Sequence, residues 1–282
     1  LTKIDFCGNL LWVNDEDAFH HSINVDHEGN YWVPSRMFPF SIDKELIGKN
    51  LYDYNDDAIT KISSNGRILY QKSVTEILIN NGYKSLLFSQ QDYQWDKIHL
   101  NDIQPTLNNG PYWNRGDIFI SLRNLSMIIH YRPKLDKIMD IITGSFFNQH
   151  DVDIINEKEI SIFNNNTFLT RSGKRVLTNN EVLIYNFESK KFYKKFAKSI
   201  AFNNVKTIEH GLNEIMKDGS MLVDERDEGR ILMFNNNGDL EWEYVNRGKN
   251  GMLYYVWWPR IVDDKEIVIN LRKKIKKKSC LN

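Results

Sequence analysis

The chain has 282 residues, of which 41% are hydrophobic and 26% charged, a composition that indicates a globular protein and excludes a disordered one. Lysine plus arginine and aspartate plus glutamate number 37 each, so the formal net charge is zero. This balance argues against a general nucleic-acid-binding protein, which normally carries a basic excess. No apolar run approaches the ~18 residues of a transmembrane helix, so we expect no membrane-spanning segment.

The first residue and the two cysteines give little further information about the fold. The first residue is Leu1 rather than methionine, so we expect a processed or truncated N-terminus and no visible signal peptide. Cys7 and Cys280 are the only cysteines. Two cysteines exclude a disulfide framework and a cysteine-based zinc site, and whether these two pair stays open.

Aromatic residues make up 12% of the chain and favour β structure, and a hairpin pattern recurs along the sequence. Each copy has a short strand, a tight turn and a second strand with bulky residues. The Asn65-Gly66 and Asn237-Gly238 pairs are strong turn signals, because a positive φ costs little at these residues. The copies lie at 4–12, 59–70, 128–138, 182–192 and 231–242.

A second pattern, His-x-x-Asn/Asp followed by a strand, alternates with the hairpins. It begins at His21, His99, His150 and His210, which are 78, 51 and 60 residues apart. Several of the strands that follow end near an arginine, at Arg36, Arg123 and Arg226. Four strands in each repeat of about 40–60 residues are typical of propeller blades.

The repeats predict an all-β fold, a β-propeller with five to six four-stranded blades around a central channel, and six in a full-length protein. Residues 1–271 form the single propeller domain, and 272–282 form a basic, solvated C-terminal tail. We expect a short helix or insertion at 73–83. Four blades cover 20–73, 96–142, 150–198 and 208–246, and 257–271 joins 3–13 in a further blade.

The repeat also predicts where the chemistry lies, because the innermost strand of each propeller blade lines the channel. Residues at equivalent repeat positions therefore converge, although they are distant in sequence. The four repeated histidines would meet in one cavity, and three interpretations stay open. They could tie neighbouring strands by hydrogen bonds, bind a metal, or bind a tetrahedral oxyanion together with Arg123.

Other motifs narrow the function further. The sequence has no Gly-rich phosphate loop, G-x-S-x-G turn or H-E-x-x-H helix, so nucleotide-dependent transfer has no support and we expect no cofactor. Aromatic clusters at Tyr112-Trp113 and 254–258 could line a pocket for a flat substrate, although such clusters more often belong to a core.

Several strings resemble the arylsulfotransferase family. They are His20-His21 with Gly29-Asn30, the run 99–105 (HLNDIQP), Gln149-His150-Asp151, 160–165 (ISIFNN), 218–225 (DGSMLVDE), Gly229-Arg230-Ile231-Leu232 and 242–247 (WEYVNR). The chain departs from the family at Ser22, where an aspartate is expected, and at Asn164-Asn165-Asn166, where Phe163 would be followed by Asp-Asn-Gly.

The resemblance implies a six-bladed propeller that transfers a sulfuryl group from an aryl sulfate to a phenol without a nucleotide donor. His150 matches the nucleophile, which is sulfated transiently. His99, Asn101 and Arg123 match sulfate-binding positions, and His21 matches a further one. A neutral imidazole suits this role because it is nucleophilic near pH 7 and can leave again. No metal is implied.

The resemblance also implies partners and a setting. The expected partners are small phenols and aryl sulfates, with no nucleic acid and no defined oligomer. Exported family members suggest a periplasmic or extracellular location. Two other functions stay open: a catalytically silent propeller that binds an anion or a protein, and a metal- or quinone-dependent oxidoreductase.

Overall fold

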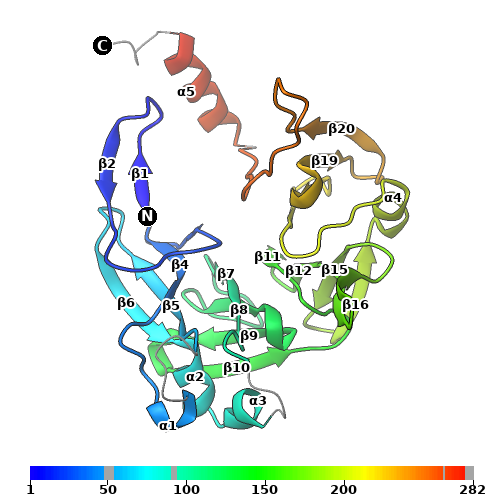
Figure 1. The fold of residues 1–282 in the computed structure, drawn as a ribbon. Coiled ribbons are helices and arrows are strands. Elements are labelled where there is room, and N and C mark those ends of the chain that lie inside the picture. Colours follow the sequence, from blue (N-terminus) through cyan, green and yellow to red (C-terminus); the bar gives the residue numbers. More distant parts are fainter. Residues whose placement is uncertain (48–53, 90–93, 263, 277–282) are drawn as a thin grey trace.

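The fold is described from a computed structural model that covers residues 1–47, 54–89, 94–262 and 264–276. Four antiparallel sheets of four strands follow one another around an arc (Figure 1). In each sheet the four strands lie side by side in the order in which they occur in the sequence. The predicted all-β propeller architecture is confirmed, with four complete blades among the described residues.

The first two blades match the predicted ranges 20–73 and 96–142. Blade 1 comprises β3 (Asn24–Val25), β4 (Tyr31–Arg36), β5 (Asp57–Ile62) and β6 (Ile68–Ser73). Blade 2 comprises β7 (Leu100–Pro105), β8 (Ile118–Leu122), β9 (Met127–Arg132) and β10 (Lys137–Ile142). The helix α1 (Lys44–Ile47) lies between β4 and β5, and the helices α2 (Val74–Asn80) and α3 (Lys84–Phe88) lie between the two blades. The short helix predicted at 73–83 is therefore confirmed.

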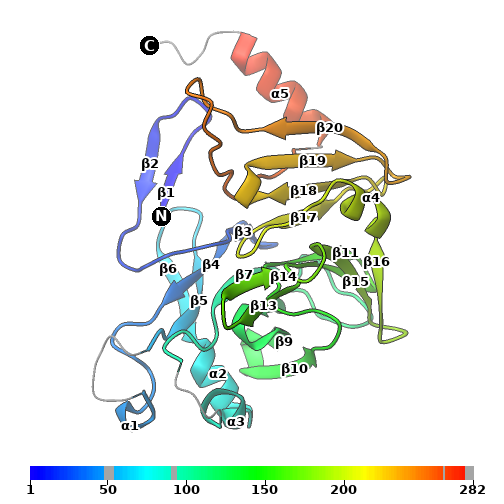
Figure 2. The ribbon, with the colours of Figure 1, turned by 45° about the vertical axis from the view of Figure 1, so that its right-hand side comes forward.

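The other two blades match 150–198 and 208–246. Blade 3 comprises β11 (Asp151–Asn156), β12 (Glu159–Asn164), β15 (Glu181–Asn186) and β16 (Lys191–Lys195). A hairpin of β13 (Thr167–Thr170) and β14 (Gly173–Val176) is inserted between β12 and β15. After α4 (Ala197–Phe202), blade 4 comprises β17 (Leu212–Ile215), β18 (Met221–Glu225), β19 (Arg230–Phe234) and β20 (Leu240–Val245), as Figure 2 shows.

The two ends of the chain differ from the prediction. β1 (Thr2–Ile4) and β2 (Leu10–Val13) form a separate two-stranded hairpin. The assignment of 257–271 to strands of a further blade is wrong, because Lys265–Lys276 form the helix α5. Asp264 begins this helix, since its carboxylate accepts the amides of Glu266 and Ile267 at 2.9 and 3.0 Å. Cys280 lies outside the described residues, so the structure does not test whether it pairs with Cys7.

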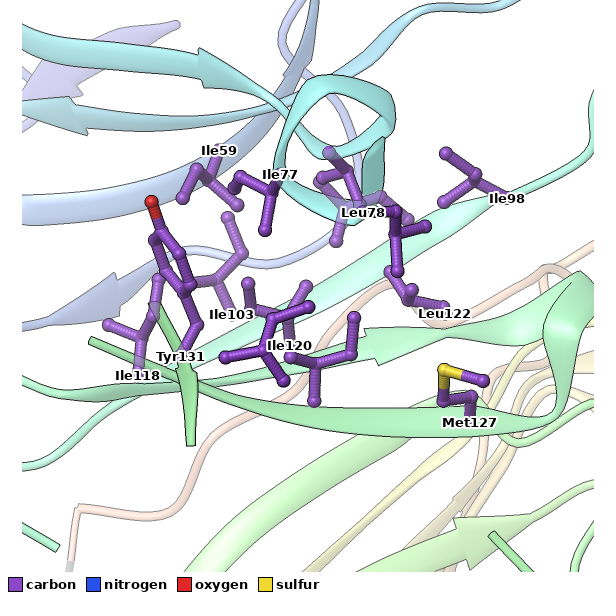
Figure 3. Packing of buried hydrophobic residues seen from close by; sticks show 14 of the residues in the cluster. Ile59, Ile77, Leu78, Ile98, Ile103, Ile118, Ile120, Leu122, Met127 and Tyr131 are labelled. Atoms are coloured by element: carbon purple, nitrogen blue, oxygen red, sulfur yellow. The ribbon is translucent and has the colours of Figure 1, made fainter. Parts of the chain in front are cut away.

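The hydrophobic core consists of layers between neighbouring blades. Strand β8 is buried on both faces, and its side chains alternate between two layers. Ile118, Ile120 and Leu122 face blade 1 and helix α2 (Figure 3), while Phe119 faces blade 3. A third layer joins blades 3 and 4 around Phe163. This interlayer packing fixes each blade against the next and brings the first strands of the blades together.

We predict that Ile120→Ala lowers the free energy of unfolding by about 2–5 kcal/mol, because Ile120 is fully buried and the change leaves a cavity between two blades. Urea titration followed by circular dichroism measures the loss. Leu169→Ala is the control, because Leu169 is 77% exposed on the β13–β14 hairpin; a change there within about 0.5 kcal/mol is expected. Equal losses in the two variants would contradict the layered core.

Candidate functional site in the central channel

The four repeated histidines meet at one point, as the repeat predicted. The ring centroid of His21 lies 5.2 Å from that of His99, 5.4 Å from that of His150 and 6.3 Å from that of His210. The rings of His150 and His210 are nearly parallel, with centroids 5.2 Å apart. Each histidine lies shortly before the first strand of its blade, so residues nearly 190 positions apart share one site (210 − 21 = 189).

These histidines line a cavity of about 450 Å³. Its size is within the range of pockets for small organic ligands. Arg123, which was predicted to bind sulfate, also lines this cavity. The full lining is His20, His21, Asp96, His99, Arg123, Asn124, His150, Lys174, Glu209, His210, Gly211, Asp224, Arg226, Val256, Trp257 and Trp258.

The fourth residue of each His-x-x-Asn/Asp repeat has a different role, because it lies on the inner strand itself. The Asn24 amide donates to the Asp102 carboxylate at 2.9 Å, and Asp102 also accepts the backbone amide of Val152 at 3.1 Å. These bonds join blades 1, 2 and 3. Hydrogen bonding between blades therefore explains the asparagine and aspartate of the repeat, whereas the histidines face a cavity.

His150 is held in one tautomer. Its Nδ1 lies 3.1 Å from the carbonyl oxygen of Gly211, and a carbonyl can only accept, so Nδ1 carries the proton. Burial, with the nearby His21, His210 and Arg123, holds the pKa of His150 well below its usual value. The ring is therefore neutral and Nε2 keeps its lone pair. Nε2 is buried and has no hydrogen-bond partner within the described part of the chain.

Gly211 is required at this contact for steric reasons. Its φ is +108°, a region that L side chains rarely adopt. A Cβ there would lie 2.6 Å from the Phe163 ring and 2.9 Å from the Asp224 carbonyl oxygen. The absence of a side chain lets the Gly211 carbonyl reach the His150 ring.

His20 and His21 form a hydrogen-bonded pair in which the position of each proton can also be assigned. The His20 Nε2 donates to the Ser35 carbonyl at 3.3 Å, which leaves its Nδ1 to accept from His21 Nδ1 at 2.6 Å. Burial and neighbouring positive groups lower the pKa of His20 to about 4 and that of His21 to about 2. Both rings are neutral at pH 7, and His21 Nε2 carries a lone pair.

His99 has a carboxylate within hydrogen-bond distance, whereas the carboxylate paired with His20, Asp57 Oδ1, lies 3.6 Å from His20 Nε2. The Nδ1 of His99 lies 2.6 Å from Asp96 Oδ2. Burial would raise the pKa of Asp96, but the hydrogen bond to His99 and its charge prevail, and the pKa is lowered. His99 and His21 both have left-handed backbones, with φ values of 52° and 57°. Such conformations are uncommon outside glycine and occur often at functional sites.

Two arginines supply the positive charge of the cavity. Arg123 is only 3% exposed; it donates to Asn124 Oδ1 at 3.1 Å and to the Ile208 carbonyl at 3.2 Å, while its Nε is buried without a partner among the described residues. Arg226 occupies the equivalent place after β18, and its guanidinium lies 4.0 Å from the Trp257 ring centroid. Since the imidazoles of His20, His21, His150 and His210 are neutral, the arginines rather than these rings make the cavity attractive to an anion.

Asn101 does not line the cavity. It is fully buried, and its amide donates at 2.9 Å to the carbonyl of Gln149, the residue before His150. The structure therefore places Asn101 behind His150, where it supports the backbone that carries the imidazole.

The two aromatic clusters named in the sequence analysis lie in different environments. Trp113 packs in the layer between blades 2 and 3 and is 5% exposed. Trp257 and Trp258 line the cavity, with ring centroids 5.2 Å from His210 and 5.4 Å from His150. Asp96 and Arg226 were not among the predicted site residues, whereas His210 was expected in the cavity without an assigned role and the cluster 254–258 was expected more often to belong to a core. Arg226 had a visible signal, since it repeats the position of Arg123.

Metal binding has no further support. Among the residues that the structure describes, no group of three His, Cys, Asp or Glu side chains is placed to hold a metal ion. In the same residues, no helix is long and apolar enough to cross a membrane.

We predict that His21 and His150 stay neutral at about pH 5, where histidines of the unfolded chain are protonated because their pKa is about 6.5. Ring-nitrogen NMR shifts of ¹⁵N-histidine-labelled protein measure this, with assignments from single His→Asn variants and the urea-unfolded protein as reference. His150 should show protonated Nδ1 and bare Nε2. Protonation of its Nε2 at pH 6 would contradict the buried, neutral site.

A search of curated proteins finds none that matches the chain. A solved protein of unknown function from Bacteroides caccae is similar in fold, with a TM-score of 0.51 at 11% identity, over 85% of this chain and 72% of that chain. Streptogramin B lyase matches with a TM-score of 0.46 at 12% identity, over 91% of this chain and 83% of that one. The family model for arylsulfotransferase (ASST) matches residues 1–247, and the chain therefore belongs to the arylsulfotransferase family.

Proposed function

We propose that this protein transfers a sulfuryl group from an aryl sulfate to a phenol through a sulfated His150. Family membership supports an arylsulfotransferase-type function in general. The observation that carries the specific proposal is the bare Nε2 of His150, which is neutral and belongs to a ring in the cavity wall. We also propose the periplasmic or extracellular setting that the resemblance implies.

The reaction consists of two displacements at sulfur. In the first, the lone pair of His150 Nε2 attacks the sulfur atom, the bond from sulfur to the phenolic oxygen breaks, and the phenolate leaves with the electron pair. In the second, the oxygen of an acceptor phenol attacks the same sulfur and the nitrogen–sulfur bond breaks. Splitting one transfer into two easier steps is the general advantage of a covalent intermediate. The fixed proton on Nδ1 keeps Nε2 as the atom that attacks sulfur in the first step and leaves with the electron pair of the nitrogen–sulfur bond in the second.

Charge on the transferred group is balanced by Arg123 in the wall of the same cavity. Arg123 offers its unpartnered Nε and is held rigid by Asn124 and the Ile208 carbonyl. Donors fixed before the reaction stabilise developing charge without a reorganisation cost.

The two tryptophans offer a place for the aryl ring of the substrate. Trp257 is 65% exposed and its ring contacts His210 and Arg226. Trp258 lies against His150. A flat, apolar group bound against these two rings would present its sulfate ester to His150, and we therefore expect a preference for aryl over alkyl sulfates.

We predict that His150→Asn abolishes transfer from p-nitrophenyl sulfate to phenol, with a loss of at least about 10³-fold in kcat. Asparagine retains a donor for the Gly211 carbonyl but provides no nucleophilic nitrogen. Release of nitrophenolate measured by absorbance reports the reaction. The matched control is His27→Asn, because His27 is exposed and outside the cavity.

Two results would reject the enzymatic function. One is absence of nitrophenolate release by the unmodified protein, and the other is unchanged turnover in His150→Asn. Calorimetric binding of p-nitrophenyl sulfate without turnover would instead support the anion-binding propeller, whose ligand would occupy the same cavity around Arg123.

We predict that Trp257→Ala raises KM for p-nitrophenyl sulfate about tenfold, equivalent to ~1.4 kcal/mol, with a smaller effect on kcat. The change removes apolar contact area from the aryl position and leaves His150 in place. Steady-state kinetics separates the two parameters. Trp242→Ala on β20 is the control, because Trp242 is 45% exposed and outside the cavity; an equal KM change there would contradict the assignment.

A further inference from the structure

Sulfuryl transfer between two phenols also requires the transfer of a proton. The role inferred below for His99 and Asp96 rests on the proposed function. The donor phenol leaves as a phenolate, which is a poor leaving group unless it is protonated. The acceptor phenol must lose its proton before or during attack on sulfur. A group that gives a proton in the first displacement and takes one in the second would serve both steps.

Most of the imidazoles in the cavity are unsuited to this task. His150 is occupied at Nδ1 by Gly211, and its Nε2 is the nucleophile. Burial lowers the pKa of His210 to about 4, and the pKa values of His20 and His21 are lowered to about 4 and about 2. These rings hold a proton too weakly to be protonated near neutral pH.

His99 is the exception, because the Asp96 carboxylate is hydrogen-bonded to its ring. The two side chains lie 2.6 Å apart, from His99 Nδ1 to Asp96 Oδ2. Since the ionised carboxylate can only accept, Nδ1 keeps its hydrogen and Nε2 is the atom that can exchange a proton. The His99 side chain is 29% exposed and lines the cavity, so Nε2 is accessible to a bound phenol.

The pair is held in place from the backbone. Asn124 donates from its side chain to the Asp96 carbonyl at 2.6 Å and from its amide to the Ile98 carbonyl at 3.1 Å. The amide of Arg123 donates to the His99 carbonyl at 3.1 Å. The 3-10 turn that positions the anion-binding Arg123 thus also fixes Asp96 and His99, so the charge-stabilising and proton-transferring groups keep a constant separation.

We propose that His99 is the proton carrier of the reaction and that Asp96 is the residue that positions it and stabilises its charged form. Protonated His99 gives its Nε2 proton to the leaving phenolic oxygen while His150 takes the sulfuryl group. Neutral His99 then takes the proton of the acceptor phenol as that oxygen attacks sulfur. Each cycle returns His99 to its protonated form, and no external proton is consumed.

The test compares aryl sulfates whose phenols differ in basicity, because proton donation matters most for a poor leaving group. Phenyl sulfate releases a strongly basic phenolate, whereas p-nitrophenyl sulfate releases a weak base. For Asp96→Asn we expect kcat/KM to fall about 10²-fold with phenyl sulfate and less than about fivefold with p-nitrophenyl sulfate. His99→Gln should show the same selectivity, so the test does not depend on one variant folding.

The matched control is Asp117→Asn, which removes a similar carboxylate from His130 at 2.9 Å, in blade 2 and outside the cavity. Equal losses with both donors in the two cavity variants, or the same selectivity in Asp117→Asn, would overturn the inference. These outcomes are distinct from failure of the proposed function, in which the unmodified protein would release no phenol from either donor.

Discussion

The hydrogen bond from His150 Nδ1 to the Gly211 carbonyl is the contact on which the site depends. It joins the residue before the first strand of blade 3 to the residue before the first strand of blade 4, and it determines which ring nitrogen of His150 carries the proton. An Nε2 without a partner in a buried setting costs about 1–3 kcal/mol, which the packing of the surrounding blades must offset. The same nitrogen is available for attack because nothing in the described fold satisfies it.

Burial also determines the charge of the channel. The low dielectric surroundings keep four of the imidazoles neutral, which leaves the positive charge of the cavity to Arg123 and Arg226. Glu209 and Asp96 balance part of this charge. With fixed guanidinium groups and neutral imidazoles, the proposed nucleophile would stay unprotonated beside a bound sulfate ester.

Much of this architecture could be predicted from the sequence, because the repeat fixes both the blades and the points that converge. The hairpin turns, the helix near 74–80 and the meeting of His21, His99, His150 and His210 all follow from it. The segment 257–271 was misjudged because its β-branched residues suggested strands. The spacing of Ile267, Leu271 and Ile275, and the capping Asp264, indicate a helix instead.

The remaining site residues depend on how loops lie between blades, which no local pattern reports. Trp257 and Trp258 follow the last blade and return to the centre, and Asp96 contacts His99 only because the chain turns into a left-handed conformation there. Asn165, the residue that the chain shares with the family's Asp-Asn-Gly pattern, donates to the Thr207 and His210 carbonyls at 3.1 and 2.7 Å. It thus ties blade 3 to the loop that carries His210.

Mass spectrometry of the rapidly quenched protein tests the central claim most directly. The protein is mixed with p-nitrophenyl sulfate in the absence of an acceptor, quenched at alkaline pH and digested. We predict one sulfuryl group per chain, attached to Nε2 of His150, and its loss when phenol is added before the quench. A chain that releases nitrophenolate but stays unmodified at His150, or carries the sulfuryl group on another residue, would contradict the account.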